Sequence, residues 1–357
     1  MHTTRDTQCW LALRPSQSFC PRCAGKCTLR GASDNSAGCP DRVSNHLGVG
    51  SRWNFVGGVR QVYGSESNPQ ADVTPVPTQK ENSPNRDWAQ TQPLRGRSGL
   101  VTGAAHGIGR SIALRLAQLG ANVGLNYWSS AEAARATAKE IEATGRQALL
   151  LQGDVGSEED VRRVVSAAHE QFGTLDFLVN NAGGAGGAKT DSPIDVAVFE
   201  DWARVLASNL NATFLCTRYV SPFMLEAKGG KIVNISSICG ITGDCGPAYC
   251  ASKAGILGLT RHSAVALAPF VQVNAILPGF VDSQPHDAKK VARITPGRTM
   301  GHPEDVADLT GYLIASPQRF LTGSCIVLDG GVTNGIIGRM MDWDEVLALE
   351  ERRLGPM

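Results

Sequence analysis

The stretch SGLVTGAAHGIG, residues 98–109, contains the pattern that decides the fold. A short apolar run opens it, and three glycines then follow with the spacing G-x3-G-x-G. From Ile108 onward, apolar residues such as Ile112 and Leu116 recur at helical spacing until Gly120. We therefore expect a buried strand that turns through glycines directly into a helix.

Strand and helix patterns alternate along the chain after this turn. Six more short apolar segments lie at residues 121–127, 147–152, 175–180, 231–236, 271–277 and 324–329. Helical periods occupy residues 131–144, 157–172, 198–228 and 247–268. Strands that are apolar on both faces and separated by helices predict a parallel sheet covered on both sides. The predicted fold class is α/β, a Rossmann-type, doubly wound and mostly seven-stranded parallel sheet in a single domain.

The composition changes near residue 92 and divides the chain into three parts. Residues 1–92 are rich in Ser, Gly, Pro, Asn and Gln and lack long apolar periods, so we expect a disordered leader there. Its arginines, serines and few acidic residues suit a transit peptide, and translation from a misplaced start is the alternative. Residues 93–335 form the predicted domain, and residues 336–357 form a C-terminal extension. We expect a cytoplasmic protein, or an organellar one if the leader is a transit peptide.

Charge and hydropathy argue against two classes of partner. The net charge is +1 and charged residues make up 19% of the chain, so no excess of charge favours nucleic acid or an anionic membrane. No apolar run approaches the roughly 18 residues that a transmembrane helix needs. We therefore expect neither a nucleic-acid nor a membrane partner.

The ten cysteines fall into two groups of five. The first group lies within the first 39 residues and includes CPRCAGKC, to which Cys39 or His46 could add a fourth ligand. No paired knuckle recurs, so we predict no metal site. The second group lacks the spacing of a disulfide framework, and we expect its members to be reduced thiols. These are Cys216, Cys239, Cys245, Cys250 and Cys325.

The glycine turn is suited to bind an anion. Glycines allow the backbone to approach a pyrophosphate closely, and the helix that follows offers free N–H groups and a positive dipole end. Ligands of doubly wound sheets lie beyond the carboxyl ends of the strands, where this turn is placed. The pattern favours a dinucleotide site, and a turn that only joins strand to helix is the alternative.

A second stretch, AYCASKAG, carries Tyr249 and Lys253 four residues apart, on one face of a helix. An ammonium group beside a phenol stabilises the phenolate, so we expect Lys253 to lower the pKa of Tyr249 from about 10. Ser237 directly follows the predicted strand at 231–236, where its hydroxyl can orient a substrate oxygen. The side chain of its neighbour Ser236 is expected to point elsewhere.

Together these features resemble the short-chain dehydrogenase/reductase family over about residues 93–335. The family's marks occur in order, namely the glycine turn, Gly153-Asp154-Val155, NNAG at Asn180–Gly183, Asn209, Ser237, the Tyr249–Lys253 pair and Pro278-Gly279. The resemblance implies an enzyme that transfers hydride between a nicotinamide cofactor and a carbonyl or secondary alcohol. It implies catalytic roles for Asn209, Ser237, Tyr249 and Lys253, with Asn209 holding a water that links Lys253 to solvent.

The same resemblance implies the residues that contact the cofactor. They are Gly103, His106, Gly107, Ile108, Gly109, Tyr127, Asp154, Val155, Asn181, Ala182, Gly183, Tyr249, Lys253, Pro278, Gly279, Val281 and Ser283. An acidic residue at the position of Tyr127 would bind the adenosine ribose and repel a 2′-phosphate. None is present, and His106, Arg110 and Ser129 could contact the phosphate. We therefore favour NADP(H) over NAD(H).

The nearest-looking subgroup is the 3-oxoacyl-acyl-carrier-protein reductase type. A sugar, polyol or other secondary-alcohol dehydrogenase is the alternative, followed by a catalytically silent dinucleotide-binding regulator. A glycine-rich insertion after NNAG and a shortened segment between Gly279 and Gly297 leave the substrate open. By resemblance we expect a homo-oligomer, a tetramer formed through the long helices 198–228 and 247–268.

Overall fold

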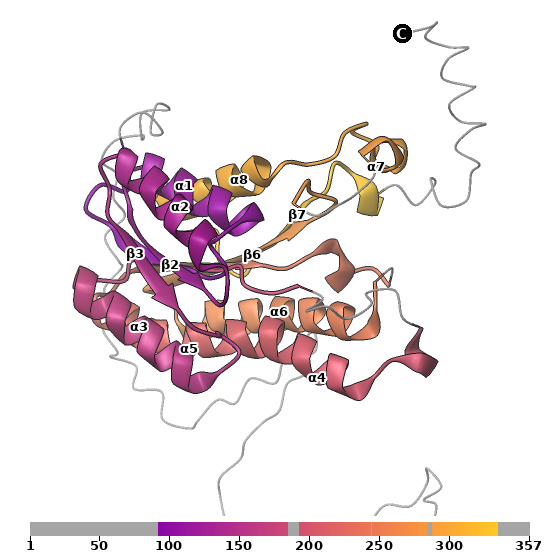
Figure 1. The fold of residues 1–357 in the computed structure, drawn as a ribbon, viewed down its shortest axis with the longest axis horizontal. Coiled ribbons are helices and arrows are strands. Elements are labelled where there is room, and N and C mark those ends of the chain that lie inside the picture. The colour runs from indigo at the N-terminus through magenta and orange to yellow at the C-terminus, as the bar shows by residue number, and fades with distance from the viewer. Residues whose placement is uncertain (1–91, 185–192, 244, 284–287, 335–357) are drawn as a thin grey trace, which may run out of the picture. The chain divides into compact units, whose positions relative to one another are not determined.

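The structure is a computed structural model that describes residues 92–184, 193–243, 245–283 and 288–334. Seven parallel strands form one sheet in the order β3-β2-β1-β4-β5-β6-β7 (Figure 1). The strands are β1 Ser98–Val101, β2 Asn122–Tyr127, β3 Ala148–Gln152, β4 Phe177–Asn180, β5 Gly230–Ile235, β6 Val271–Pro278 and β7 Cys325–Leu328. The predicted fold class is confirmed. Its strand order reverses direction between β1 and β4, which is where doubly wound sheets bind ligands.

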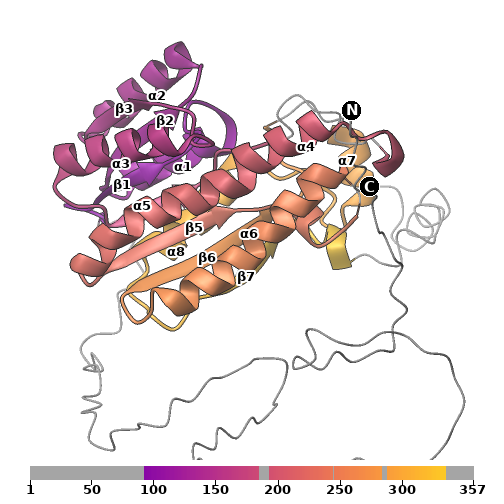
Figure 2. The same cartoon turned by 90° about the horizontal axis from the view of Figure 1, so that it is seen from below.

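Helices cover both faces of the sheet (Figures 1 and 2). On one face lie α1 Gly107–Gln118, α2 Ala131–Ala143 and α8 Pro303–Ala315. On the other lie α3 Glu158–Phe172, α4 Phe199–Leu206, α5 Ala212–Glu226 and α6 Pro247–Ala266. The short α7 spans Ala288–Ile294. The sequence reading missed α8, although Pro303 at its first turn and the acidic Glu304 and Asp305 after it are helix-start signals.

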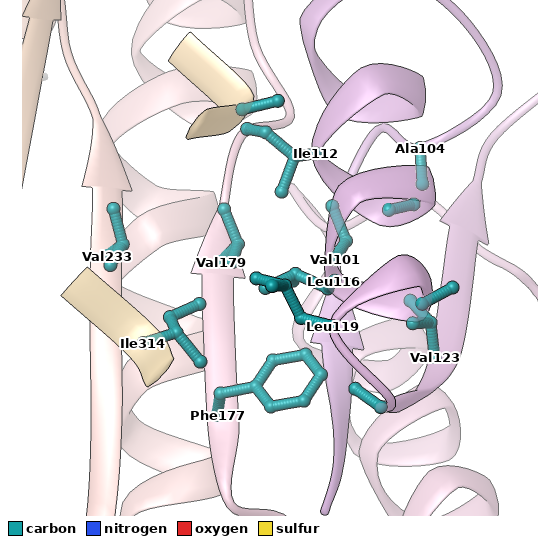
Figure 3. Packing of buried hydrophobic residues seen from close by; sticks show 14 of the residues in the cluster. Val101, Ala104, Ile112, Leu116, Leu119, Val123, Phe177, Val179, Val233 and Ile314 are labelled. Carbon is teal, nitrogen blue, oxygen red and sulfur yellow. The ribbon is translucent and has the colours of Figure 1, made fainter. Parts of the chain in front are cut away.

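Two hydrophobic clusters lie on opposite faces of the sheet. Neighbouring residues of β1 divide between them, because Val101 packs under α1 and Leu100 packs under α3. Figure 3 shows Ile112 and Leu116 of α1 together with Phe177 of β4 in the first cluster. Both faces of the central strands are thus buried, which explains why these strands are continuous apolar runs and not alternating ones.

The predicted helix 198–228 is interrupted inside the molecule. Residues Ala207–Asn211 form a single π-helical stretch between α4 and α5, and Asn209 lies in it, fully buried. Such π turns are concentrated at functional sites, because the extra residue re-aims a side chain. Pattern reading treated 198–228 as one period and could not detect this change.

The prediction that all five later cysteines are reduced is wrong for two of them. Cys239 and Cys245 form a disulfide, whereas Cys216, Cys250 and Cys325 are free. A 3-10 turn at Ile238–Gly240 folds the chain back after β5 and brings the two Cα atoms to 5.9 Å, a separation that a disulfide can span. Burial raises the pKa of the Cys216 thiol to about 12.

Several sequence predictions fall outside the described residues. The leader with its CPRCAGKC cysteines, most of the glycine-rich insertion and the C-terminal extension belong to this group. Within the described ranges, no cluster of three or more His, Cys, Asp and Glu side chains is placed to hold a metal ion. In the same ranges, no helix combines the length and the apolar character needed to cross a membrane.

Candidate active site

The glycine turn requires glycine for two physical reasons. Gly103 and Gly107 have φ angles of +63° and +55°, in the left-handed region that L side chains rarely adopt. Close approach is the second reason, because a Cβ on Gly103 would lie 2.9 Å from the Cα of Ala182. A Cβ on Gly109 would come even closer to the carbonyl oxygen of Gly103 and to the Asn181 amide. The turn can keep this compact shape only while these positions carry no side chain.

The NNAG segment after β4 holds the turn in place. Asn181 Nδ2 donates hydrogen bonds to the carbonyl oxygens of Thr102 and Gly103, at 3.0 and 3.1 Å. The backbone N–H groups of Asn181 and Ala182 both donate to Thr102 Oγ1. From β2, Asn126 Oδ1 accepts a 3.3 Å hydrogen bond from Gly103 N. The carboxyl ends of β1, β2 and β4 are therefore tied into one rigid edge.

The N-terminus of α1 is left uncapped at this edge. Its N-cap residue, His106, is exposed and makes no side-chain capping bond, and the first turn that includes Ile108 holds no acidic residue. In contrast, α3 is capped by Ser157 and carries three acidic residues in its first turn. An uncapped helix start offers backbone N–H groups and a positive dipole end to an anion. The residues present therefore fit the pyrophosphate of a dinucleotide.

The segment that follows β6 reaches the same turn. A Cβ built on Gly107 would lie 3.4 Å from the Cβ of Ser283. Gly279 follows Pro278 and donates to the carbonyl of Leu328 at 2.9 Å, and Val281 is buried. Ser283 after β6 is thus beside Gly107 after β1, although Ser283 lies 176 positions further along the sequence.

The ends of β2 and β3 contain the other predicted cofactor residues. Tyr127 is 8% exposed and packs with Ala105 and Ala134, while its neighbour Trp128 is 70% exposed. Arg110, which was expected to face a phosphate, pairs instead with Glu140 of α2 at 2.6 Å. The basic charge at this corner is therefore partly neutralised by α2.

The loop after β3 is shaped by carboxylates. Asp154 Oδ1 accepts from Gly156 N at 2.8 Å, and the Asp154 N–H donates to Asp160 Oδ2 at the same distance. Val155, next in the chain, is buried in the cluster beneath α3. These bonds hold the Gly153-Asp154-Val155 loop at the carboxyl end of β3.

Three side chains meet where β5 ends and α6 begins. Lys253 Nζ lies 5.5 Å from the centre of the Tyr249 ring and donates a 3.0 Å hydrogen bond to the carbonyl of Ile235. The Ser237 hydroxyl is hydrogen-bonded to the Tyr249 side chain. The Ser236 hydroxyl donates to the Lys253 carbonyl at 2.8 Å. Ser237 is therefore the serine whose side chain bonds Tyr249, while Ser236 bonds the Lys253 backbone.

The expectation of a lowered pKa for Tyr249 is wrong for the chain alone. Burial raises the pKa of Tyr249, the hydrogen bond from Ser237 opposes that shift, and the nearby Cys250 adds to it. Burial also lowers the pKa of Lys253 to about 8. Both shifts have one cause, because burial disfavours whichever form of a group is charged. The i, i+4 spacing predicts that the Tyr249 and Lys253 side chains lie close together, but it does not indicate how far they are shielded from water.

Asn209 connects the π turn to this group. Its Nδ2 donates to Ser252 Oγ at 2.9 Å, and Ser252 Oγ in turn donates to the Tyr249 carbonyl at 2.8 Å. Asn209 Oδ1 accepts from Gly184 N at 2.8 Å, and a Cβ on Gly183 would fall against that oxygen. The water assigned to Asn209 by resemblance stays a prediction. Sequence reasoning missed Ser252, although its place three residues after Tyr249 puts it on the adjoining turn of the helix.

The edge described above defines a class of protein, a doubly wound sheet with a glycine turn suited to a dinucleotide, beside a half-buried tyrosine and a buried lysine. The short chain dehydrogenase family model matches residues 98–293. The chain belongs to the short-chain dehydrogenase/reductase family, as the sequence resemblance predicted, and is an oxidoreductase of that family.

Similar proteins agree with this placement. A 3-oxoacyl-acyl-carrier-protein reductase of Staphylococcus aureus is 38% identical over 244 residues, which cover 66% of this chain and 98% of the relative. A reductase of the same description from Synechocystis is 38% identical over 245 residues, or 67% of this chain and 98% of the relative.

Solved structures show the same likeness. The 3-oxoacyl-acyl-carrier-protein reductase of Brucella melitensis with bound NAD is 32% identical, with a TM-score of 0.62 over 71% of this chain and 96% of its own. A short-chain type dehydrogenase/reductase of Mycobacterium marinum is 31% identical, with a TM-score of 0.63 over 69% and 98%.

Proposed function

We propose that this chain reduces a carbonyl compound with a nicotinamide cofactor, in the manner of a 3-oxoacyl-acyl-carrier-protein reductase. The observation that carries the proposal is the contact of Ser237, Tyr249 and Lys253 at the sheet edge that also holds the glycine turn. The names of the relatives support a ketoacyl thioester as the substrate class.

The cofactor would lie along the carboxyl edge of the sheet. The uncapped start of α1 and the turn at Gly103 would hold its pyrophosphate, and the loop at Asp154 would contact its adenine. The Asn181–Gly183 segment and the stretch from Pro278 to Ser283 would enclose the remainder. When bound, the nicotinamide cofactor supplies the hydride that reduces the carbonyl carbon.

The chain's own residues handle the proton. Tyr249 donates its phenolic proton to the substrate oxygen, and its raised pKa keeps that proton in place at neutral pH. Ser237 orients the substrate oxygen and the phenol through its hydroxyl. Lys253, whose pKa is lowered to about 8, still carries its proton at neutral pH and stabilises negative charge that forms on Tyr249. Asn209 fixes the helix turn beneath Tyr249 through Ser252.

We also propose a preference for NADP(H) and a homo-oligomer. The buried Tyr127 stands where a carboxylate would repel a 2′-phosphate, which supports NADP(H). Exposed apolar side chains on α4, α5 and α6 support assembly through these helices, since Phe199, Phe214 and Val265 are 74%, 44% and 80% exposed.

The function is tested by following oxidation of NADPH against β-ketoesters, ketoacyl thioesters, sugars and quinones. We expect turnover with the thioesters, and we expect Tyr249→Phe to lower kcat by about 100-fold or more with an unchanged dissociation constant for NADPH. Tyr219→Phe is the matched control, because Tyr219 contacts Glu158, Arg162 and Arg218 and none of the proposed catalytic side chains. Full activity in Tyr249→Phe would refute the assignment, and a silent panel with NADPH bound would favour a regulator.

A further inference from the structure

The Cys239–Cys245 disulfide joins the two elements that supply the reacting side chains. Cys239 lies in the 3-10 turn two residues after Ser237, and Cys245 lies two residues before α6 begins at Pro247. Tyr249 is the third residue of α6. The bond therefore fixes the approach of the β5 end to the first turn of the helix that carries Tyr249.

One end of the disulfide controls the Ser237 hydroxyl. The backbone N–H of Cys239 donates a 3.2 Å hydrogen bond to Ser237 Oγ. A serine hydroxyl has one hydrogen to donate, so this bond leaves it free to point at the Tyr249 oxygen. The Ser237 hydrogen bond is in turn what opposes the rise in the pKa of Tyr249. The position of Cys239 thus sets the partner that Tyr249 depends on.

The other end is tied to the helix start. The Cys250 thiol donates to the carbonyl oxygen of Cys245 at 3.3 Å, and the Cys250 N–H donates to Gly246 at 3.0 Å. Cys250 follows Tyr249 directly in the first turn of α6. Displacement of Cys245 would therefore shift the first turn of α6, which carries Tyr249.

We propose that the Cys239–Cys245 pair is a redox-sensitive positioning site, and that its reduction lowers carbonyl-reductase activity by loosening the Ser237–Tyr249 hydrogen bond. The proposal rests on the proposed function. Both cysteines are half-buried and not sealed in the core, so a dithiol can reach them. The dithiol breaks the S–S bond through a mixed disulfide. The two sulfurs of the protein take up two electrons and two protons, and the dithiol becomes a disulfide.

The experiment compares the purified full chain before and after treatment with dithiothreitol. Alkylation and peptide mass spectrometry would establish the state of Cys239 and Cys245 in each sample. We expect kcat for a ketoacyl thioester to fall about fivefold on reduction, the worth of one neutral hydrogen bond, with an unchanged dissociation constant for NADPH. Oxidation with glutathione disulfide should restore the rate.

A pH profile separates positioning from a general loss of structure. Carbonyl reduction needs both Lys253 and Tyr249 protonated, so the rate falls first near the Lys253 pKa of about 8 and again above the higher pKa of Tyr249. Loss of the Ser237 hydrogen bond raises the pKa of Tyr249, and in the reduced protein the second alkaline limb should move to higher pH. A merely structural role would lower the rate at all pH values without moving the limb.

Variants complete the test. The double variant Cys239→Ser, Cys245→Ser should resemble the reduced protein and should not respond to dithiothreitol. Cys325→Ser, on β7, is the matched control and should respond as the wild type does. The proposal is overturned if reduced protein with both cysteines alkylated keeps or exceeds its turnover number, or if the double variant still responds.

If no substrate is turned over, the proposed function fails on its own. Ultraviolet titration of the phenolate, with Tyr249→Phe as the reference, still reports whether reduction shifts the pKa of Tyr249. An unshifted pKa would then overturn the disulfide proposal separately.

Discussion

Replacement of Gly109 by alanine tests the glycine turn most directly. Gly109 is the third residue of α1 and has an ordinary helical backbone, so alanine at this place is not opposed by φ. In open surroundings it would stabilise the helix by about 1 kcal/mol. The added Cβ would instead lie under 3.0 Å from the Gly103 carbonyl oxygen and from the Asn181 amide. The Gly103 carbonyl is backbone and the Asn181 amide is held by two hydrogen bonds, so the backbone must move.

The cost can be worked from the contacts that are lost. Forcing one methyl group into a packed site costs about 1–3 kcal/mol. The two hydrogen bonds from Asn181 to Thr102 and Gly103 contribute about 1 kcal/mol each, and both must lengthen. After the helix gain of about 1 kcal/mol is subtracted, we expect a net loss of about 2–4 kcal/mol in the free energy of unfolding. The dissociation constant for NADPH should rise about tenfold or more, because the N–H groups of α1 shift.

Urea unfolding and titration with NADPH measure the two effects. Gly258→Ala in α6 is the matched control, since a Cβ there meets nothing within 4 Å, and this variant should be as stable as the wild type or slightly more so. If Gly109→Ala unfolds at the wild-type urea concentration and binds NADPH with the wild-type dissociation constant, the account of the turn as a sterically closed cradle is refuted.

Two further predictions concern charge. Because the pKa of Lys253 falls from 10.5 to about 8 on folding, the unfolded chain binds more protons between those pH values, and stability at this site rises with pH. In the wild type, the free energy of unfolding should therefore rise by on the order of 3 kcal/mol between about pH 7 and about pH 10, as measured by urea unfolding. Lys253→Met should remove this rise, whereas Lys139→Met, at an exposed lysine, should retain it. Glu140→Gln releases Arg110 and should lower the dissociation constant for NADPH severalfold relative to NADH. Glu142→Gln on the same helix should leave the ratio unchanged, and an unchanged ratio in both would exclude Arg110 from phosphate binding.

The sheet could be predicted from sequence because its signals are local. Leu100 and Val101 are both buried on opposite faces, and that double burial requires the uninterrupted apolar run that the sequence displays. The glycine turn was equally visible, since Gly103 and Gly107 occupy backbone conformations that other residues avoid. Helix α8 also has a local signal, Pro303 in its first turn, and could have been predicted from it.

The remaining differences depend on contacts between distant segments. Arg110 and Glu140 form an ion pair between two helices, and their separation of 30 residues in the sequence does not predict this contact. In the π turn, the Asn209 side chain bonds Ser252 and Gly184, which are distant from it in sequence. The Cys239–Cys245 bond follows from a 3-10 turn that folds the chain back on itself. Each of these three features depends on tertiary contacts, which the periodicity of the sequence does not reveal.

The acid–base pair shows why the local pattern was insufficient for mechanism. The i, i+4 spacing correctly brings Lys253 to the Tyr249 ring, but burial then acts on both groups and favours the neutral form of each. Because Lys253 is itself desolvated, its effect on the pKa of Tyr249 differs from that of a solvated ammonium group. The Ser237 hydrogen bond does lower the pKa of Tyr249, and the same hydroxyl accepts a hydrogen bond from the Cys239 N–H. The pKa of Tyr249 therefore depends on the turn after β5 as well as on the helix that holds the tyrosine and the lysine.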